Sequence, residues 1–290
     1  MSVLSFEGNR GIMATINKLV APVVKWVGGK RQIIDQIIRR VPDTYCTYYE
    51  PFLGGGAVLF KLQPVKVVAS DINAELINLY QVIKNNVEEL INDLKRHKNE
   101  EEYYYMIRGL DRNKNKYNKL TPVQRASRII FLNKTCFNGL FRVNKAGEFN
   151  TPFGSYKNPN IVNEAVLRAV SVYFNRAEVT LTSRDFEEVL AKARKGDFAY
   201  LDPPYDPVSK TAYFTDYNKG GFDSSEQIRL KTVCDKLDRK GVKFLLSNSA
   251  TAFIKDLYRD YHIEVIQAKR PINSRADKRG AIDEVLVMNY

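Results

Sequence analysis

The chain is organised around residues 197–205, which read Asp-Phe-Ala-Tyr-Leu-Asp-Pro-Pro-Tyr. Its short apolar run follows a Lys-Gly pair, which predicts a buried strand. Pro203 and Pro204 end that strand, because neither has an amide N–H to donate and each fixes φ. Asp202, Pro203 and Tyr205 are therefore held together at the carboxyl end of a strand, where open α/β sheets bind their ligands.

The residue types in this turn suggest recognition of a flat ring that carries an amino group. Asp202 and the Pro203 carbonyl can accept hydrogen bonds from an exocyclic NH2, while Tyr205 stacks on the face of the ring. A Pro-Pro pair is also common in surface turns that bind nothing. The turn by itself leaves both interpretations open.

Composition favours a polyanionic partner. The 290-residue chain has a formal charge of +12 and a pI of about 9.4, although a solvated basic surface is the alternative. Three widely spaced cysteines argue against a disulfide framework and predict a reducing cytoplasm. His97 and His262 are the two histidines, so we expect no zinc site. The chain has no run of about 18 apolar residues that would predict a membrane span.

A glycine pair precedes the first expected helix, within the stretch Lys25-Trp26-Val-Gly-Gly-Lys30. A phosphate-binding loop is excluded, because that motif requires Gly at 24 and Ser or Thr at 31, where the chain has Val24 and Arg31. The glycines still allow a ligand to approach the backbone, beside two lysines and a stacking ring. A helix entry with its tryptophan in the core is the alternative.

A second glycine turn, containing Phe52, Gly54 and Gly56, joins an expected strand to a helix. Such a turn brings backbone N–H groups against a ligand. A dinucleotide fingerprint would place Gly or Ala at position 59, where the chain has Leu59, so a dehydrogenase is disfavoured.

The next expected strand, residues 65–70, ends at Asp71, whose carboxylate can bridge ribose hydroxyls. Together with the glycine turn, this residue fits an adenosine-type cofactor without a pyrophosphate. The alternative is that Asp71 caps the following helix.

Composition changes after about Lys95. Apolar residues recur at helical spacing from Ile72 to about Lys95, and residues 100–120 are charged and rich in tyrosine. We interpret residues 73–159 as an inserted, basic, mostly helical subdomain. Residues 1–72 and 160–290 would then form the main domain.

A helix beginning at Thr121, with Gln124 completing a capping box, leads into a loop over residues 133–144. A second loop covers residues 147–157. The two loops contain groups suited to base edges, stacking or wedging, although polar loops often have such a composition anyway: Phe137, Asn138, Leu140, Arg142 and Pro152.

The α/β pattern then resumes, with helices expected near 160–174 and 224–239 and strands near 179–182, 243–249, 263–267 and 284–289. Between the last two strands lies a basic loop that contains Arg275 and Lys278 and suits phosphate contacts. A solvated charge run is the alternative. The expected fold is an α/β, Rossmann-like sheet with an inserted helical subdomain.

Taken in order, these motifs resemble the DNA adenine methyltransferase (Dam) family, the α-order amino-methyltransferases of host marking and restriction–modification. The likeness covers about residue 22 to the C-terminus. It implies a methyltransferase sheet with an inserted DNA-recognition subdomain. The matching segments are 25–30, 51–56, 70–73, 137–142, 149–154 and 202–205.

The resemblance implies S-adenosylmethionine as the cofactor. Asp185 matches a position expected near its adenine, and the glycine turn would lie under its methionine half. Four further positions match family residues that bind it: Trp26, Lys30, Asp71 and Asp202.

The resemblance also implies double-stranded DNA as the partner and a flipped adenine as the target of N6 methylation. Phe137 falls where a relative has an aromatic wedge, commonly Tyr, and Lys25 where a residue approaches a guanine. Pro152 belongs to the second loop motif. Asn138, Leu140 and Arg142 match positions that read or fill the duplex, and relatives with this loop recognise GATC.

Three alternative functions stay open. A cytosine-N4 methyltransferase would more usually have Ser in place of Asp202. An RNA or protein methyltransferase would leave the basic insertion unused, and a catalytically inactive DNA-binding protein would leave the ligand-binding features unexplained. In a restriction–modification system, the enzyme would be paired with a restriction endonuclease.

Overall fold

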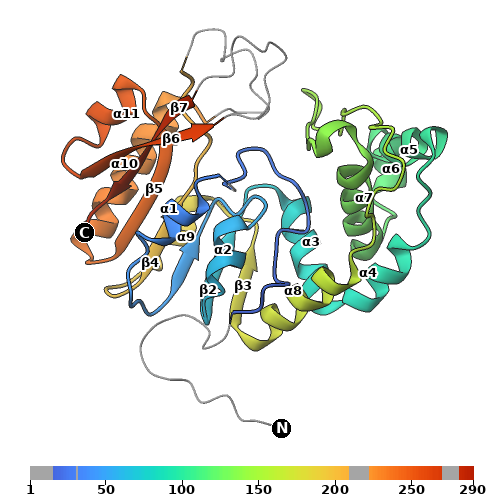
Figure 1. Cartoon of the computed structure of the whole chain (residues 1–290), viewed down its shortest axis with the longest axis horizontal. Helices are drawn as coiled ribbons and strands as arrows, with labels where there is room; N and C mark the ends of the chain where they lie inside the picture. The colour runs from blue at the N-terminus through green and yellow to red at the C-terminus, as the bar shows by residue number, and fades with distance from the viewer. Residues whose placement is uncertain (1–15, 31, 209–221, 270–280) are drawn as a thin grey trace.

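The computed structural model describes residues 16–30, 32–208, 222–269 and 281–290. Within these ranges the chain forms a seven-stranded sheet in the order β3-β2-β1-β4-β5-β7-β6 (Figure 1). The strands are β1 (Tyr48–Glu50), β2 (Lys66–Ser70), β3 (Glu178–Thr182), β4 (Phe198–Leu201), β5 (Lys243–Ser249), β6 (His262–Lys269) and β7 (Ala281–Met288).

The sheet has its switch point between β1 and β4. From β1 the chain moves outward through β2 to β3, then returns to β4 and β5 on the other side, and all these strands are parallel. β7 runs antiparallel to both β5 and β6. Ligands of such sheets bind beside the strands' carboxyl ends at the switch point, here next to Glu50 and Leu201. The predicted α/β, Rossmann-like fold is confirmed.

Successive side chains of the central strands pack into two different cores. Tyr48 and Tyr200 belong to one buried cluster, and their neighbours Tyr49 and Leu201 belong to another. Because neighbouring side chains of a strand point to opposite faces, both faces of the sheet must be covered by helices. The first cluster includes side chains of α1 (Ile34–Ile38), α2 (Ala57–Leu62), α3 (Ala74–Asn85) and α8 (Glu164–Arg176), and the second those of α9 (Phe186–Leu190), α10 (Ser224–Arg239) and α11 (Ala252–Leu257).

The helix expected from Ile72 to about Lys95 is two helices. Asn86, with φ −136°, interrupts the helical backbone between α3 and α4. The capping box at Thr121 is confirmed, because its side chain and that of Gln124 bond each other's backbone N–H. The further helices of this region are α4 (Val87–Leu94), α5 (Glu101–Arg108), α6 (Lys114–Tyr117) and α7 (Pro122–Thr135), with 3₁₀ turns at Gly109–Arg112 and Phe137–Gly139.

The helical region, which lies to the right of the sheet in Figure 1, has a buried core of its own. This buried cluster contains Tyr104, Phe131, Leu132, Cys136 and Phe149. α3 contacts α8 and β3 as well as α7, so it joins the sheet to the helical region. The domain boundary at residue 73 stays a prediction. No helix in the described ranges is long and apolar enough to cross a membrane.

Candidate active site

Asp202 lies directly after β4, and its carboxylate has two polar partners. Lys30 Nζ lies 2.6 Å from Asp202 Oδ1, and the Ser247 hydroxyl donates to the same oxygen at 3.0 Å. Burial raises the pKa of Asp202, while the Lys30 charge and the Ser247 hydrogen bond oppose that rise. Among the described residues no donor bonds Oδ2, so this oxygen can accept a hydrogen from a ligand.

Two buried amide side chains hold the turn after β4. Gln227 Nε2 donates to the Pro204 carbonyl at 2.9 Å, and Gln227 Oε1 accepts from Asn248 Nδ2 at 3.1 Å. Asn248 Oδ1 in turn accepts from the backbone N–H of Asp206 at 3.0 Å. Gln227 and Asn248 are both fully buried. These bonds fix the backbone on either side of Tyr205.

The Tyr205 ring is fixed at its outer end. Its hydroxyl donates to Glu284 Oε2 at 2.8 Å, and Lys30 Nζ lies 4.5 Å from the ring centroid. Sequence reasoning missed Ser247, Asn248, Gln227 and Glu284. A usable signal existed for the first two, because they lie near the carboxyl end of β5, the strand beside β4.

Glu50, the last residue of β1, is a second buried carboxyl group at this edge. It is 2% exposed and accepts a hydrogen bond of 2.7 Å from the Tyr48 hydroxyl. Burial raises the pKa of Glu50 to about 8, and the nearby Asp202 charge acts in the same direction. Glu50 is therefore mostly protonated at neutral pH. Sequence reasoning gave it no role.

The glycine turn after β1 is bonded to the end of β2. Gly54 N donates to Asp71 Oδ2 at 2.9 Å, and Asp71 Oδ1 accepts from Asn73 N at 2.9 Å. Gly54 has φ +48°, and a Cβ there would lie only 3.1 Å from Trp26 Cδ1. The structure thus brings three predicted cofactor-binding residues, Trp26, Gly54 and Asp71, into one place.

The interpretation of Asp71 as a helix cap is wrong. Asn73 caps α3 instead, because its Oδ1 accepts from the backbone N–H groups of Glu75 and Leu76 at 3.1 Å. Burial raises the pKa of Asp71, and its two backbone hydrogen bonds oppose that rise.

Phe52 and Asp185 lie beside an aromatic cluster. The Phe52 ring lies 5.3 Å from Phe186 and 5.7 Å from Phe222. Asp185 caps α9, and Arg229 donates to both of its carboxylate oxygens at 2.8 Å. This pairing lowers the pKa of Asp185. A role for Asp185 near a cofactor stays a prediction.

The segment containing Lys25 and Trp26 contacts the helical region. The Trp26 ring is stacked on Phe141, with centroids 4.3 Å apart and an interplanar angle of 23°. Lys25 Nζ donates to the Asn138 carbonyl at 2.7 Å. Trp26 is partly buried against the sheet's core, so it has core contacts as well as this stack.

The loop after α7 presents an exposed aromatic ring. Phe137 is 56% exposed, and Asn138 beside it has φ +57°. Pro152 is also exposed, and its carbonyl accepts a hydrogen bond of 2.9 Å from Phe137 N. The two predicted recognition loops therefore lie side by side.

Arg142 is partly buried and held by a neighbour. Its Nε donates to Asn150 Oδ1 at 2.6 Å, and its Nη2 donates to the Asn150 carbonyl at 3.3 Å. Leu140 is also partly buried, and its carbonyl accepts from the Thr151 hydroxyl at 2.7 Å. The orientation of the guanidinium group is thus set within the loops.

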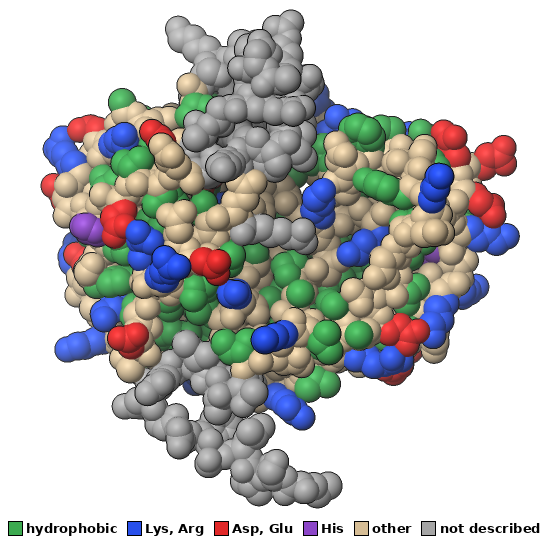
Figure 2. All heavy atoms as spheres, in the orientation of Figure 1, with side chains coloured by type: hydrophobic (Ala, Val, Ile, Leu, Met, Phe, Trp, Pro, Cys, Tyr) green, Lys and Arg blue, Asp and Glu red, His purple; other side chains and the backbone are tan. Residues whose placement is uncertain are grey.

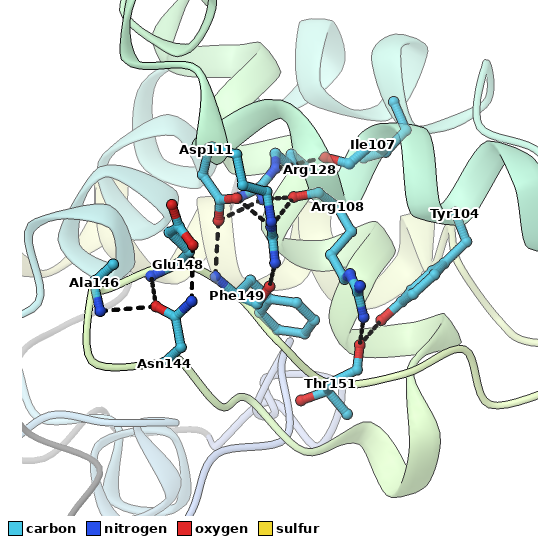
Figure 3. Close-up of polar contacts among 11 residues, drawn as sticks. Tyr104, Ile107, Arg108, Asp111, Arg128, Asn144, Ala146, Glu148, Phe149 and Thr151 are labelled. Atoms are coloured by element: carbon cyan, nitrogen blue, oxygen red, sulfur yellow. Dashed lines mark hydrogen bonds and ion pairs between the residues drawn. The ribbon is translucent and has the colours of Figure 1, made fainter.

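Charged side chains inside the helical region support these loops (Figure 3). Asp111 Oδ2 accepts from Phe149 N and lies beside Arg128 Nη2, both at 2.8 Å. The Tyr104 hydroxyl and Arg108 Nη1 donate to the Thr151 carbonyl at 2.8 and 3.2 Å. Part of the charge in the basic region is therefore used within the protein.

Basic side chains are spread over the molecule. On the face shown in Figure 2, Lys and Arg side chains lie over both the sheet part and the helical part. Arg275 and Lys278, the predicted phosphate contacts, lie outside the described residues.

Comparisons with known proteins show the family of the chain. The family described as "D12 class N6 adenine-specific DNA methyltransferase" matches residues 26–272. The chain is 43% identical over 277 residues to "Type II methyltransferase M1.LlaDCHI" of Lactococcus lactis subsp. cremoris, covering 94% of this chain and 97% of that protein. It is 45% identical to "Type II methyltransferase M.MjaIII" of Methanocaldococcus jannaschii (93% and 99% covered) and 33% identical to "DNA adenine methylase" of Serratia marcescens (91% and 97% covered). The chain belongs to the D12 class of N6 adenine-specific DNA methyltransferases.

Proposed function

We propose that this protein transfers the methyl group of S-adenosylmethionine to N6 of an adenine rotated out of duplex DNA at the sequence GATC. The observation that carries the proposal is the position of Asp202. Its carboxylate follows β4 at the switch point of the sheet, beside a turn that ends in an anchored tyrosine.

In this proposal the cofactor lies across the ends of β1 and β2. Asp71 binds the ribose hydroxyls, the turn from Phe52 to Gly56 lies under the methionine half, and Trp26 stacks. The close packing of Trp26 on the Gly54 turn supports a common role for these residues. When bound, the sulfonium supplies an electrophilic methyl group.

The protein's part in the chemistry is to orient a weak nucleophile. The adenine amine is conjugated with its ring, so its lone pair has to be turned toward the methyl carbon. Asp202 and the Pro203 carbonyl accept the two amine hydrogens, and the Tyr205 ring holds the base. The amine nitrogen forms the new bond to carbon as the bond to sulfur breaks, so the thioether S-adenosylhomocysteine is the leaving group. The nitrogen then loses a proton to solvent. Rotation of the base out of the duplex costs a few kcal/mol of stacking and pairing.

Residues 73–159 are proposed to read the target. Phe137 fills the space left in the duplex, while Asn138, Leu140 and Arg142 contact base edges. The exposure of the Phe137 ring supports this role. The GATC site rests on the likeness of residues 137–142 to the recognition loop of the Dam family.

The biological role is proposed to be modification of DNA in a restriction–modification system. The two relatives named "Type II methyltransferase" favour this role, and a restriction endonuclease would be the functional partner. The relative named "DNA adenine methylase" favours host marking as the other use of the same reaction.

One incubation series tests the proposal. The protein is mixed with methyl-labelled S-adenosylmethionine and a GATC duplex, duplexes changed at one base pair, RNA or protein, and the methylated base is identified by mass spectrometry. We expect N6-methyladenine in the GATC duplex alone. The Asp202→Ala variant should lose nearly all turnover while its affinity for DNA stays within a few fold. N4-methylcytosine, or labelling of RNA or protein, would contradict the proposal.

A further inference from the structure

We propose that Asn133 is a positioning residue that couples the cofactor segment to the DNA-reading loop, so that each ligand tightens the binding of the other. The cofactor segment is Lys25–Trp26, and the DNA-reading loop is residues 137–142. The inference rests on the proposed function, because it takes the first segment to contact the cofactor and the second to contact DNA.

Asn133 is a buried side chain that bonds both segments. It lies near the end of α7 and is 2% exposed. Its Oδ1 accepts from Lys25 N at 2.8 Å, and its Nδ2 donates to the Lys25 carbonyl at 2.8 Å and to the Gly139 carbonyl at 3.1 Å. Both amide hydrogens are therefore used. One side chain thus fixes the backbone of the cofactor segment and that of the loop.

Further contacts at the same place restrict movement of the DNA-reading loop relative to the cofactor segment. A Cβ at Gly139 would lie 3.0 Å from Lys25 Cδ, so the loop backbone packs directly on the lysine stem. Lys25 Nζ bonds the Asn138 carbonyl, and the Trp26 ring is stacked on Phe141. A shift of the loop toward a base would therefore displace the Trp26 ring.

The cofactor segment, which contacts the DNA-reading loop, is also close in sequence to a residue that pairs with the reacting carboxylate. Lys30, a few residues after Trp26, pairs with Asp202 at 2.6 Å. The three hydrogen bonds of the Asn133 side chain all go to backbone atoms of Lys25 and Gly139, so its proposed effect on the two ligands runs through these segments. Two ligands that stabilise the same arrangement of these two segments bind cooperatively, and the coupling is reciprocal.

Calorimetry measures this coupling in the full-length protein. The affinity for S-adenosylhomocysteine, the unreactive product of the cofactor, is determined with and without a saturating GATC duplex. We expect the parent to bind it at least about five-fold more tightly with DNA present. Asn133→Asp keeps the acceptor for Lys25 N but loses both donors, so its affinity ratio should fall to near one.

A control at an exposed position, Asn175, separates loss of coupling from loss of a side-chain amide that bonds two backbone carbonyls. Asn175 Nδ2 also donates to two carbonyls, those of Lys84 and Ser171, at 2.7 and 2.9 Å, but its described contacts lie on α3 and α8. Asn175→Asp should keep the parental ratio. Thermal unfolding of both variants measures how much stability each loses, so that the loss of coupling can be compared with the loss of stability.

Trp26 provides a direct optical readout, because it is the one tryptophan in the chain. DNA alone, without S-adenosylhomocysteine, should change its emission through the stack on Phe141. In Phe141→Leu that change in emission should be absent, and the affinity ratio should be lower than in the parent. This second variant keeps the test valid if Asn133→Asp does not fold. An affinity ratio of one in the parent overturns the inference. So does the parental affinity ratio in both Asn133→Asp and Phe141→Leu. If the parent binds neither S-adenosylhomocysteine nor DNA, the proposed function itself has failed.

Discussion

The ammonium group of Lys30 lies 2.6 Å from the carboxylate of Asp202, and the two side chains are only 7% and 19% exposed. The residues come from distant parts of the chain, so the fold alone brings them together. A nearby cation favours the ionised form of a carboxyl group, whereas burial opposes it. Lys30 therefore helps to keep Asp202 in the form that accepts hydrogen bonds.

Lys30→Met should shift the acidic side of the pH–activity profile upward. Burial already raises the pKa of Asp202, and loss of the ammonium group removes the main effect that lowers it. The measurement is the methylation rate between about pH 5 and 9 at saturating cofactor. If the rate of Lys30→Met falls on the acidic side at the same pH as that of the parent, Lys30 does not control the ionisation of Asp202.

Glu50→Gln should make the stability of the protein depend less on pH. The pKa of Glu50 is about 8 in the folded protein, against about 4.3 for an unfolded chain. The folded state therefore holds the extra proton between these values, and its stability falls as pH rises through this range, by at most about 1.4 kcal/mol per pH unit. Above about pH 8 this contribution is lost.

Urea unfolding at several pH values between about 5 and 9 measures the effect on stability. The amide oxygen that Glu50→Gln introduces can still accept the Tyr48 hydrogen bond, so this variant should fold. Glu178→Gln, at the exposed start of β3, is the control and should keep the parental pH dependence. If the free energy of unfolding depends on pH equally in the parent and in Glu50→Gln, the pKa of Glu50 is not raised.

Asp71→Ala should weaken cofactor binding by about 1–3 kcal/mol through loss of charged hydrogen bonds. The same change frees Gly54 N and Asn73 N, so the glycine turn also loses its support. Asp71→Asn keeps an acceptor oxygen without the charge and should lose less. Calorimetry with S-adenosylhomocysteine measures the affinity of both variants. Unchanged affinity in Asp71→Ala would show that Asp71 does not bind the cofactor.

Arg142→Ala should lower discrimination at a G·C pair by about 1–3 kcal/mol, because its guanidinium fork suits O6 and N7 of guanine. Arg142→Lys should not restore it, since an ammonium group has no fork. Methylation rates on GATC duplexes and on duplexes changed at one base pair give the result, with cofactor affinity as the control. Full site preference in Arg142→Ala would assign the reading of guanine to another residue.

Arg275→Ala and Lys278→Ala should each flatten the salt dependence of DNA affinity, by about one unit of slope for each phosphate that is no longer neutralised. The parent's log affinity should fall linearly with log salt concentration. Arg259, an exposed residue of the segment after α11 that pairs with Asp256, gives the control variant Arg259→Ala. A parental slope near zero would contradict duplex binding as the role of the charge.

The features that depend on neighbours in the chain could be predicted from the amino-acid sequence. The strand before Asp202 is apolar and closed by two prolines, and the capping box at Thr121 needs only residues three positions apart. The glycine turn and Asp71 were placed correctly because the carboxyl ends of parallel strands meet at one edge of a sheet. The ends of α8, β6 and β7 differ from their expected positions by a few residues, and the break at Asn86 was missed.

Contacts between side chains that are distant in sequence could not be predicted and became visible in the folded structure. Glu284 reaches Tyr205 because β7 is inserted between β5 and β6, and no local pattern reports that order. The buried bonds of Gln227 and the pairing of Lys30 with Asp202 likewise join separate segments. A hydrogen bond or ion pair requires its two groups within about 3 Å, and that distance is set by how helices and strands pack rather than by the residues on either side.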